Sequence, residues 1–352
     1  MKVRISTDQP LHQAKNILIR ATNWIGDAVM TLPAVGTVRN SFPEAKISVL
    51  AKPWVAEIYR LSPAVDEIIL FQSPGVHAGM RGKIKLAREL RGMKFDMAIL
   101  LQNAIEAAII ALLAGIPIRA GYNSDGRGLL LTHSVQRTKA IRKLHQTGYY
   151  LEMVKSLGFQ SDETNVLLKP GVGYDELAEK ILDDLDIDMK EILVGIAPGA
   201  TYGPAKRWFP ERFAAVSDRI IDNHSARVII LGSSDDRETA DRVQQYAGHR
   251  LVNLAGKTNL KETIALIGKC KLFISNDSGL MHVAGALNIP TVAIFGSTNP
   301  VTTSPAGNNS VVIYKSASCS PCLKKRCPTD DFRCMDAIGV DDVYNIATRL
   351  LE

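Results

Sequence analysis

The chain has 352 residues, of which 46% are hydrophobic and 22% are charged. This length exceeds one ordinary hydrophobic core and predicts about two domains, and the composition excludes a disordered or membrane-embedded chain. The net charge of +6 is unevenly spread, because residues 1–170 hold 22 Lys and Arg against 13 Asp and Glu, whereas residues 171–352 hold 20 against 23. We therefore expect the first half to meet an anionic partner.

The N-terminal residues 1–15 are polar and mixed in charge, and they lack the apolar core of a secretory signal. We expect residues 1–13 to be a frayed extension. The longest apolar stretch, residues 107–118, contains Gly115 and Pro117 and is shorter than the roughly 20 residues that a membrane-spanning helix needs. These features predict a cytoplasmic protein without a transmembrane segment.

Short apolar runs alternate with amphipathic stretches along the whole chain, which predicts an α/β fold with two doubly wound parallel sheets. The strands of the first sheet are predicted at 16–20, 46–50, 67–71, 96–101 and 117–121. Those of the second are predicted at 192–197, 227–231, 251–254, 272–275 and 291–295. We place an N-terminal domain at 1–175, a second domain at 176–340, and a final helix at 341–352 that packs across the domain junction.

The segment after the first strand contains Gly26, which permits a tight turn, and Asp27, which begins the next helix. Ligands of open parallel sheets lie beyond the carboxyl ends of the strands, so Asp27 is a candidate general base at the mouth of a cleft between the domains. The alternative is a carboxylate that only caps the helix.

Two basic runs follow in the first half. They consist of Arg81, Lys83, Lys85, Arg88, Arg91 and Lys94, and of Arg137, Lys139, Arg142 and Lys143. Each is either a solvated helix face or part of the surface that meets an anionic lipid or sugar. Nucleic acid is not the expected partner, because the chain has no aromatic-rich basic strand and no zinc-finger spacing.

The first strand of the second half ends in a loop that contains two glycines, the hydroxyl residues Thr201 and Tyr202, and Lys206, before a helix opened by Pro210. The pattern is typical of a phosphate-binding loop, although it lacks the Walker spacing. A flexible loop with a solvated lysine is the alternative. The chain also lacks a G-x-G-x-x-G sequence after a strand, which argues against a nicotinamide enzyme.

The stretch F-I-S-N-D-S-G-L-M-H (273–282) changes abruptly from apolar to polar and then opens a helix at Ser278. The N–H groups of a helix N-terminus attract anions, so Asp277, Ser278 and Gly279 lie where a phosphate would be held. His282 lies one turn further on the same face. An ordinary capped helix with a packed histidine is the alternative.

Together these segments suit group transfer from a nucleoside diphosphate. Lys206 and the amides around Ser278 and Gly279 would stabilise the departing diphosphate, and Asp27 would accept the proton of the attacking hydroxyl.

Four cysteines are clustered with the spacing C-x₂-C-x₄-C-x₆-C, and a fifth, Cys270, stands alone in an apolar context and is expected to be buried. The clustered residues are Cys319, Cys322, Cys327 and Cys334. They are either ligands of a structural zinc ion or unligated thiols, since disulfides are disfavoured in a reducing cytoplasm.

Several motifs resemble those of the bacterial lipopolysaccharide heptosyltransferases of glycosyltransferase family 9, specifically the heptosyltransferase II group. They are R-A-T-N-W-I-G-D (20–27), A-G-I-P-I-R-A-G-Y (114–122), G-A-T-Y-G-P-A-K-R-W (199–208) and N-D-S-G-L-M-H-V-A-G-A-L (276–287). The resemblance implies a GT-B fold with two Rossmann-like domains facing across a cleft. It also implies an inverting, metal-independent and cofactor-free transfer of L-glycero-D-manno-heptose from ADP-heptose to heptosyl-Kdo2-lipid A. The enzyme would act in the cytoplasm, peripheral to the inner membrane.

The resemblance also implies roles for single residues. Asp27 matches the family's proposed base, and Lys206 matches its diphosphate-contacting lysine. The donor-binding set consists of Thr201, Tyr202, Lys206, Asp277, Ser278, Gly279 and His282. On the acceptor side, the candidates for contact with acidic sugars and phosphates are Arg119, Arg142 and Lys143. One departure is Q-N-A at 102–104, where many relatives have Pro-Asn-Ser.

Other readings stay open at this point. One is a heptosyltransferase that acts at another position of the core, because the donor residues would be shared. The others are a sugar-nucleotide epimerase and a non-catalytic nucleotide-binding module.

Overall fold

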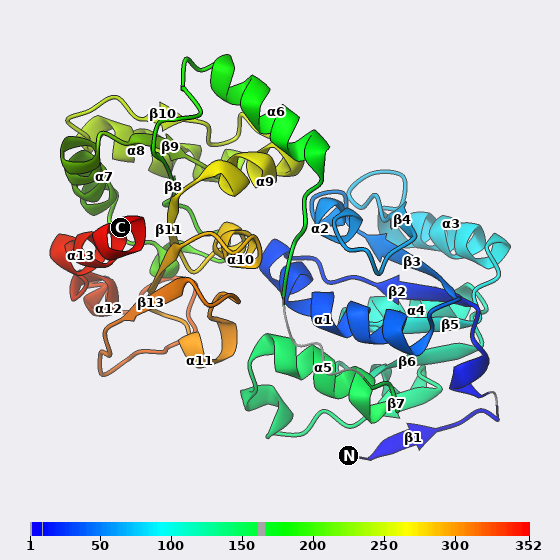
Figure 1. The fold of residues 1–352 in the computed structure, drawn as a ribbon. Coiled ribbons are helices and arrows are strands. Elements are labelled where there is room, and N and C mark those ends of the chain that lie inside the picture. Colours follow the sequence, from blue (N-terminus) through cyan, green and yellow to red (C-terminus); the bar gives the residue numbers. More distant parts are fainter. Residues whose placement is uncertain (1, 9, 161–165) are drawn as a thin grey trace. The chain divides into compact units, whose positions relative to one another are not determined.

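The structure, a computed structural model, describes residues 2–8, 10–160 and 166–352. It divides into two compact units, Met1–Val166 and Leu167–Glu352. Each unit is a mainly parallel sheet with helices on its faces (Figure 1). This is the predicted α/β architecture. The division falls nine residues before the boundary that we expected at 175, because α6 (Val172–Asp183) packs on α9 (Leu260–Lys269) of the second unit.

The first unit has a seven-stranded sheet. Its strands, in spatial order, are β1 (Val3–Ile5), β7 (His133–Val135), β6 (Ile118–Tyr122), β5 (Met97–Leu100), β2 (Asn16–Arg20), β3 (Lys46–Ala51) and β4 (Glu67–Leu70). All pairs are parallel except β1 with β7. The frayed extension that we expected over 1–13 is therefore wrong for residues 3–5, which form an antiparallel edge strand; residues 1 and 9 lie outside the described residues.

Helices cover the first sheet on both faces. They are α1 (Ile25–Ser41), α2 (Ala56–Arg60), α3 (Gly79–Gly92), α4 (Ile105–Leu113) and α5 (Gln146–Ser156). Helices α1 and α5 pack against each other, and α3 and α4 form a second pair that buries Leu86 and Ala108 together with Leu18 of β2. This winding places the carboxyl ends of β2, β3 and β5 along one edge of the sheet, where Asp27 also lies at the start of α1.

The second unit has a six-stranded parallel sheet. In spatial order its strands are β10 (Val252–Asn253), β9 (Arg227–Ile230), β8 (Leu193–Ala197), β11 (Leu272–Asn276), β12 (Thr291–Phe295) and β13 (Ser310–Tyr314). Its further helices are α7 (Pro210–His224), α8 (Arg237–Tyr246), α10 (Gly279–Ala286), α11 (Pro300–Thr303), α12 (Arg333–Asp336) and α13 (Val340–Leu351). The neighbouring strands β8 and β11 bring the two predicted donor-binding segments side by side.

The C-terminal helix α13 packs on α7 and on strands β11 to β13 of the second unit. Its Val343 and Ala347 are fully buried in the core of that unit, together with Trp208 and Phe213. Packing across the junction, which we expected of this helix, stays a prediction.

Candidate functional site

The loop after β8 and the turn after β11 meet through an ion pair. Lys206 ends the short 3-10 helix η4 (Pro204–Lys206), and its Nζ lies 2.6 Å from Oδ2 of Asp277. The side chains of Lys206 and Asp277 are only 14% and 4% exposed. Thr298, which follows β12, donates a hydrogen bond of 2.6 Å to the same Oδ2. The structure thus brings together two predicted donor residues, and it directs the Asp277 carboxylate to Lys206.

Asn276 locks the two segments in this arrangement. Its Oδ1 accepts a hydrogen bond of 2.9 Å from the Trp208 amide, and its Nδ2 donates one of 2.7 Å to the carbonyl of Pro198. Asn276 is fully buried, so both polar groups need partners inside the protein. This side chain therefore fixes where the loop of Lys206 lies against the end of β11.

Helix α10 begins beside the ion pair. Ser278 is its N-cap residue by backbone geometry, but its side chain does not cap the helix; its Oγ lies 3.0 Å from Oγ of Ser275. Ser278 and Gly279 are partly exposed, so the start of α10 is accessible directly after Asp277, the partner of Lys206. A helix N-terminus of this kind favours a bound anion. His282, in contrast, is 4% exposed and lies within the buried part of α10.

The aromatic ring of Tyr202 lies close to two cations. Lys206 Nζ is 5.1 Å from the ring centroid and Lys325 Nζ is 5.8 Å from it, and the Tyr202 hydroxyl donates a hydrogen bond of 2.9 Å to the carbonyl of Leu323. Thr201 and Tyr202 are both exposed. Lys325 was missed by the sequence analysis, although its basic neighbours Lys324 and Arg326 were a visible signal.

The segment that carries Lys325 is the cysteine-rich loop, residues 319–334. The Ala205 amide donates to the carbonyl of Lys325 at 3.1 Å, and the Leu323 amide donates to the carbonyl of Ser297 at 2.8 Å. The backbone of Gly203 has φ +154°, and a Cβ there would lie 2.3 Å from the Lys325 carbonyl oxygen. The cysteine-rich loop therefore forms one wall of the candidate site.

The four cysteines of this loop differ in their surroundings. Burial, the largest cause, together with the nearby thiols of Cys319 and Cys322, raises the pKa of Cys334. Cys327 instead contacts Thr329, at 3.5 Å between Sγ and Oγ1. All five cysteines of the chain are free thiols, and burial raises the pKa of the isolated Cys270. Within the described residues, no group of three or more His, Cys, Asp or Glu side chains is arranged to hold a metal ion.

In the first unit, Asp27 is the third residue of α1 and is partly buried. Its negative charge acts on Tyr150 of α5, whose pKa is raised well above the usual value by burial and, to a lesser extent, by Asp27. The turn that leads into α1 is held from two sides: Arg20 donates a hydrogen bond of 3.0 Å to Asn23 Oδ1, and Trp54 Nε1 donates one of 2.8 Å to the Asn23 carbonyl.

Two cations lie at the carboxyl ends of β2 and β3, and the sequence analysis missed both. Arg20 and Lys52 are 2% and 7% exposed, and both stack on Phe71, at 5.1 and 3.8 Å from the ring centroid. Burial lowers the pKa of Arg20 to about 10, and burial followed by the Arg20 charge lowers the pKa of Lys52. Lys52 donates to the Ser73 carbonyl at 2.6 Å. This edge of the sheet is therefore positively charged beside the turn that carries Asp27.

The three predicted acceptor residues lie apart from this edge. Arg119 is in the amino-terminal half of β6, and its guanidinium donates to the carbonyls of Leu130 and Ile116 at 2.8 and 2.6 Å. Arg142 and Lys143 are exposed in the short helix η3 (Ile141–Lys143). The structure does not bring Arg119 together with Asp27, because Arg119 is placed before the end of its strand and is held by backbone carbonyls there.

Asn103 belongs to a polar network. It lies in the Q-N-A segment, which differs from the Pro-Asn-Ser of many relatives. Its Nδ2 donates to the Tyr149 hydroxyl at 3.0 Å, and its Oδ1 accepts from Ser124 Oγ at 3.1 Å and from Arg127 at 3.3 Å. Arg127 is fully buried, and burial lowers its pKa to about 10. Asn103 therefore supports the loop after β5.

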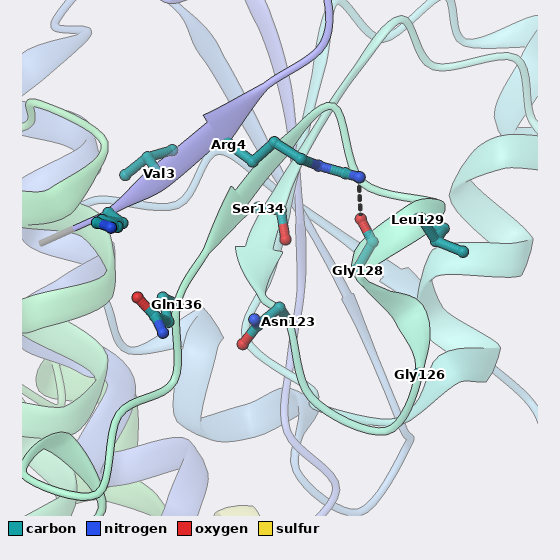
Figure 2. Close-up of a pocket in the computed structure, with 9 residues that line it drawn as sticks. Val3, Arg4, Asn123, Gly126, Gly128, Leu129, Ser134 and Gln136 are labelled. Atoms are coloured by element: carbon teal, nitrogen blue, oxygen red, sulfur yellow. Dashed lines mark hydrogen bonds between the residues drawn. The ribbon is translucent and has the colours of Figure 1, made fainter.

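One hollow of about 860 Å³ lies elsewhere in the first unit, at the β1 and β7 edge of the sheet (Figure 2). Arg4 reaches across it and donates a hydrogen bond of 2.5 Å to the carbonyl of Gly128. Asn123, Ser134 and Gln136 also line it. None of the predicted site residues is among its lining residues.

Comparison with known proteins agrees with this fold and these segments. Residues 83–332 match the family model described as glycosyltransferase family 9 (heptosyltransferase). The chain belongs to glycosyltransferase family 9. It is 32% identical over 311 residues to lipopolysaccharide heptosyltransferase 2 of Escherichia coli, which covers 84% of this chain and 87% of that protein. It is 31% identical to lipooligosaccharide heptosyltransferase 2 of Haemophilus influenzae, over 85% of this chain and 88% of the relative.

Solved structures give the same result. The structure of the E. coli ADP-heptose lipopolysaccharide heptosyltransferase II superposes with a TM-score of 0.82 at 27% identity, and covers 96% of this chain and 98% of that one. The family 9 glycosyltransferase of Veillonella parvula has a TM-score of 0.84 at 23% identity, over 96% and 97% of the two chains, which supports the fold. This family 9 glycosyltransferase thus has the two α/β units of the GT-B fold.

Proposed function

We propose that this family 9 glycosyltransferase transfers L-glycero-D-manno-heptose from ADP-heptose to heptosyl-Kdo2-lipid A, and so adds the second heptose of the lipopolysaccharide inner core. The observation that carries the proposal is the similarity, at 32% identity over 84% of the chain, to a protein named lipopolysaccharide heptosyltransferase 2. The buried pair of Lys206 and Asp277 beside a helix N-terminus supports it, because a leaving ADP needs positive charge at its diphosphate.

The donor side of the reaction uses residues of the second unit. Lys206 and the first-turn amides of α10 hold the diphosphate, and Lys325, which also lies near the Tyr202 ring, adds a second positive charge. Asp277 keeps the Lys206 ammonium in place and does not itself face the phosphates. As the bond between the anomeric carbon and ADP breaks, the charge that accumulates on the diphosphate is stabilised by these groups.

The acceptor side uses residues of the first unit. The acceptor hydroxyl attacks the anomeric carbon from the face opposite ADP, which inverts the configuration, and Asp27 accepts the hydroxyl proton. Arg20 and Lys52 give this edge of the sheet a positive potential that suits an acceptor with acidic sugars and phosphates. Arg142 and Lys143 stay candidates for more distant contacts, whereas we assign Arg119 to holding the loop before β7.

The lipid A anchor of the acceptor places the reaction at the membrane. No helix among the described residues is long and apolar enough to cross a bilayer. We therefore propose that the enzyme works in the cytoplasm, peripheral to the inner membrane.

The test is transfer of heptose from ADP-heptose to acceptors that carry zero, one or two heptoses. Product on the one-heptose acceptor alone supports the proposal. Product on another acceptor would show that the enzyme adds heptose at a different position. The chain is also 25% identical to a protein named lipopolysaccharide heptosyltransferase 1, from Pseudomonas aeruginosa. No product on any acceptor would contradict heptosyl transfer.

A further inference from the structure

Helix α4 of the first unit is apolar on the face that points away from its sheet as well as on the buried one. Ala107, Ala108, Ile110 and Ala111 are at most 3% exposed against the sheet. Its other face carries large side chains that are 36 to 43% exposed, namely Ile105, Ile109, Leu112 and Leu113. Their spacing of four, seven and eight residues puts them on one face of the helix. A surface helix of this composition indicates a missing partner.

The neighbouring helix α3 extends this apolar surface. Met80 and Ile84, one turn apart, are 68% and 36% exposed. Two contacts tie the helices together along their length: Lys83 Nζ lies 3.0 Å from Glu106 Oε1, and Arg91 donates a hydrogen bond of 2.7 Å to the Leu113 carbonyl. We call the six exposed apolar side chains of the two helices, with the basic residues of α3, the α3–α4 patch.

The rest of α3 gives the patch a positive rim. The helix carries five basic residues and one acidic residue, Glu89. Arg81, Lys85 and Arg88 are exposed, and the only ion pair among them in the described part of the chain is a loose one of 4.0 Å between Lys85 and Glu89. An apolar stripe beside exposed cations is the pattern of a surface that lies on an anionic bilayer.

We propose that the α3–α4 patch docks this protein on a membrane of anionic lipids. The apolar side chains enter the boundary between headgroups and acyl chains, and Arg81, Lys85 and Arg88 lie against the headgroups. Charge favours this partner over a second copy of the chain, because a two-fold interface through the patch would bring two positively charged surfaces together. The inference deepens the proposed function and rests on its placing of the enzyme at the inner membrane, because it names the surface and the lipid charge that hold it there. Binding through this surface requires neither ADP-heptose nor an acceptor, so the two can be tested separately.

The test measures binding of the full chain to vesicles, without donor or acceptor. Vesicles of phosphatidylethanolamine with about one third phosphatidylglycerol are compared with vesicles of phosphatidylcholine, at low and at high salt. We expect binding to the anionic vesicles that weakens at high salt. Equal binding to both kinds of vesicle, or to neither, would overturn the proposal.

Two sets of variants locate the surface. The triple variant Arg81→Gln, Lys85→Gln and Arg88→Gln should bind anionic vesicles on the order of 100-fold more weakly, since each cation near the surface contributes about fivefold. The pair Ile109→Gln and Leu113→Gln should weaken binding at high salt as well. The matched control is Leu129→Gln, which changes an 83% exposed leucine outside the patch and should leave binding unchanged.

Three further readouts separate the alternatives. The thermal unfolding midpoint shows that each variant folds. Sedimentation velocity detects a dimer, and a dimer that dissociates in the patch variants would assign the surface to a second copy and overturn the proposal. Transfer to a deacylated acceptor should be unchanged in the patch variants, while transfer to a vesicle-bound acceptor falls. If no heptose is transferred at all but vesicle binding follows the patch, the proposed function fails and this inference stands.

Discussion

Lys206 Nζ lies 2.6 Å from Asp277 Oδ2 in a place where both side chains are almost fully covered. Lys206 lies in the loop after β8 and Asp277 directly follows the adjacent strand β11. Each belongs to a segment that the sequence predicts to bind phosphate. The pair fixes the ammonium group beside the N-terminus of α10, and a single carboxylate oxygen occupies only part of the capacity of an ammonium with three N–H donors. A lysine held in advance loses less conformational freedom on binding the donor.

We predict that Lys206 and Asp277 are energetically coupled. Asp277→Asn removes the counterion of a covered lysine and should lower the free energy of unfolding by about 1–3 kcal/mol, whereas the double variant with Lys206→Met should lose less than the sum of the single changes. Denaturant unfolding of the two single variants and the double variant measures the coupling. Strictly additive losses would show that the contact has no energetic role.

We predict that Asp27→Asn lowers kcat by a factor on the order of 10² to 10⁴ and leaves the Kd of ADP-heptose unchanged. The amide is of similar size but cannot accept the proton of the attacking hydroxyl. Steady-state kinetics with calorimetric donor titration measures both quantities. Normal turnover in this variant would remove Asp27 from the mechanism.

The close approach at Gly203 gives a third prediction. Gly203→Ala forces a Cβ to within 2.3 Å of the Lys325 carbonyl at a φ of +154°, so it should displace the cysteine-rich loop, cost about 1–3 kcal/mol of stability and weaken ADP-heptose binding. Gly268→Ala is the control, because this exposed glycine of α9 has open space for a Cβ and alanine favours the helix. Wild-type donor affinity in Gly203→Ala would show that the loop is not a wall of the site.

A fourth prediction concerns pH and the start of α13. The ammonium of Lys315, 2.5 Å from Asp342, and the Gly339 amide hold the pKa of the Asp342 carboxyl below its usual value. A carboxylate with a lowered pKa stabilises the fold above its ordinary pKa, and this contribution is lost as the pH falls through the lowered value.

Asp342→Asn should therefore destabilise the protein at neutral pH, and the difference from wild type should shrink between about pH 5 and pH 2. Chemical unfolding across this range is the measurement, with Asp183→Asn on the exposed side of α6 as the control. A difference that does not change with pH would refute the assigned role of the carboxylate.

The parallel strands were predictable because each is an apolar run bounded by turn residues. Strands β2 and β12 match the prediction at both ends, and most others differ by one or two residues. The three missed strands have other causes. Strand β1 is a three-residue antiparallel edge strand, and β7 contains His133 and Ser134; both carry too little apolar signal. Strand β13, S-V-V-I-Y, was a clear apolar run after Asn308 and Asn309 and could have been found.

The candidate site was predictable in its segments but not in its contacts. Whether a functional group lies just beyond a strand can be predicted from the neighbouring residues alone. Asp27, Lys206 and Asp277 all lie in segments that follow a strand. The pairing of Lys206 with Asp277 depends on β8 and β11 being neighbours across 71 residues of chain, which local periodicity does not encode. The burial of Arg20 and Lys52 around Phe71 has the same long-range origin.

The decisive measurement is the binding and use of ADP-heptose by wild type, Lys206→Ala and Lys180→Ala. Lys180 is an exposed residue of α6 in the second unit and serves as a charge-matched control. We predict that Lys206→Ala alone weakens ADP-heptose binding and lowers the rate of heptosyl transfer, because the leaving diphosphate loses its fixed cation. Wild-type affinity and rate in Lys206→Ala would contradict the donor site proposed for the second unit.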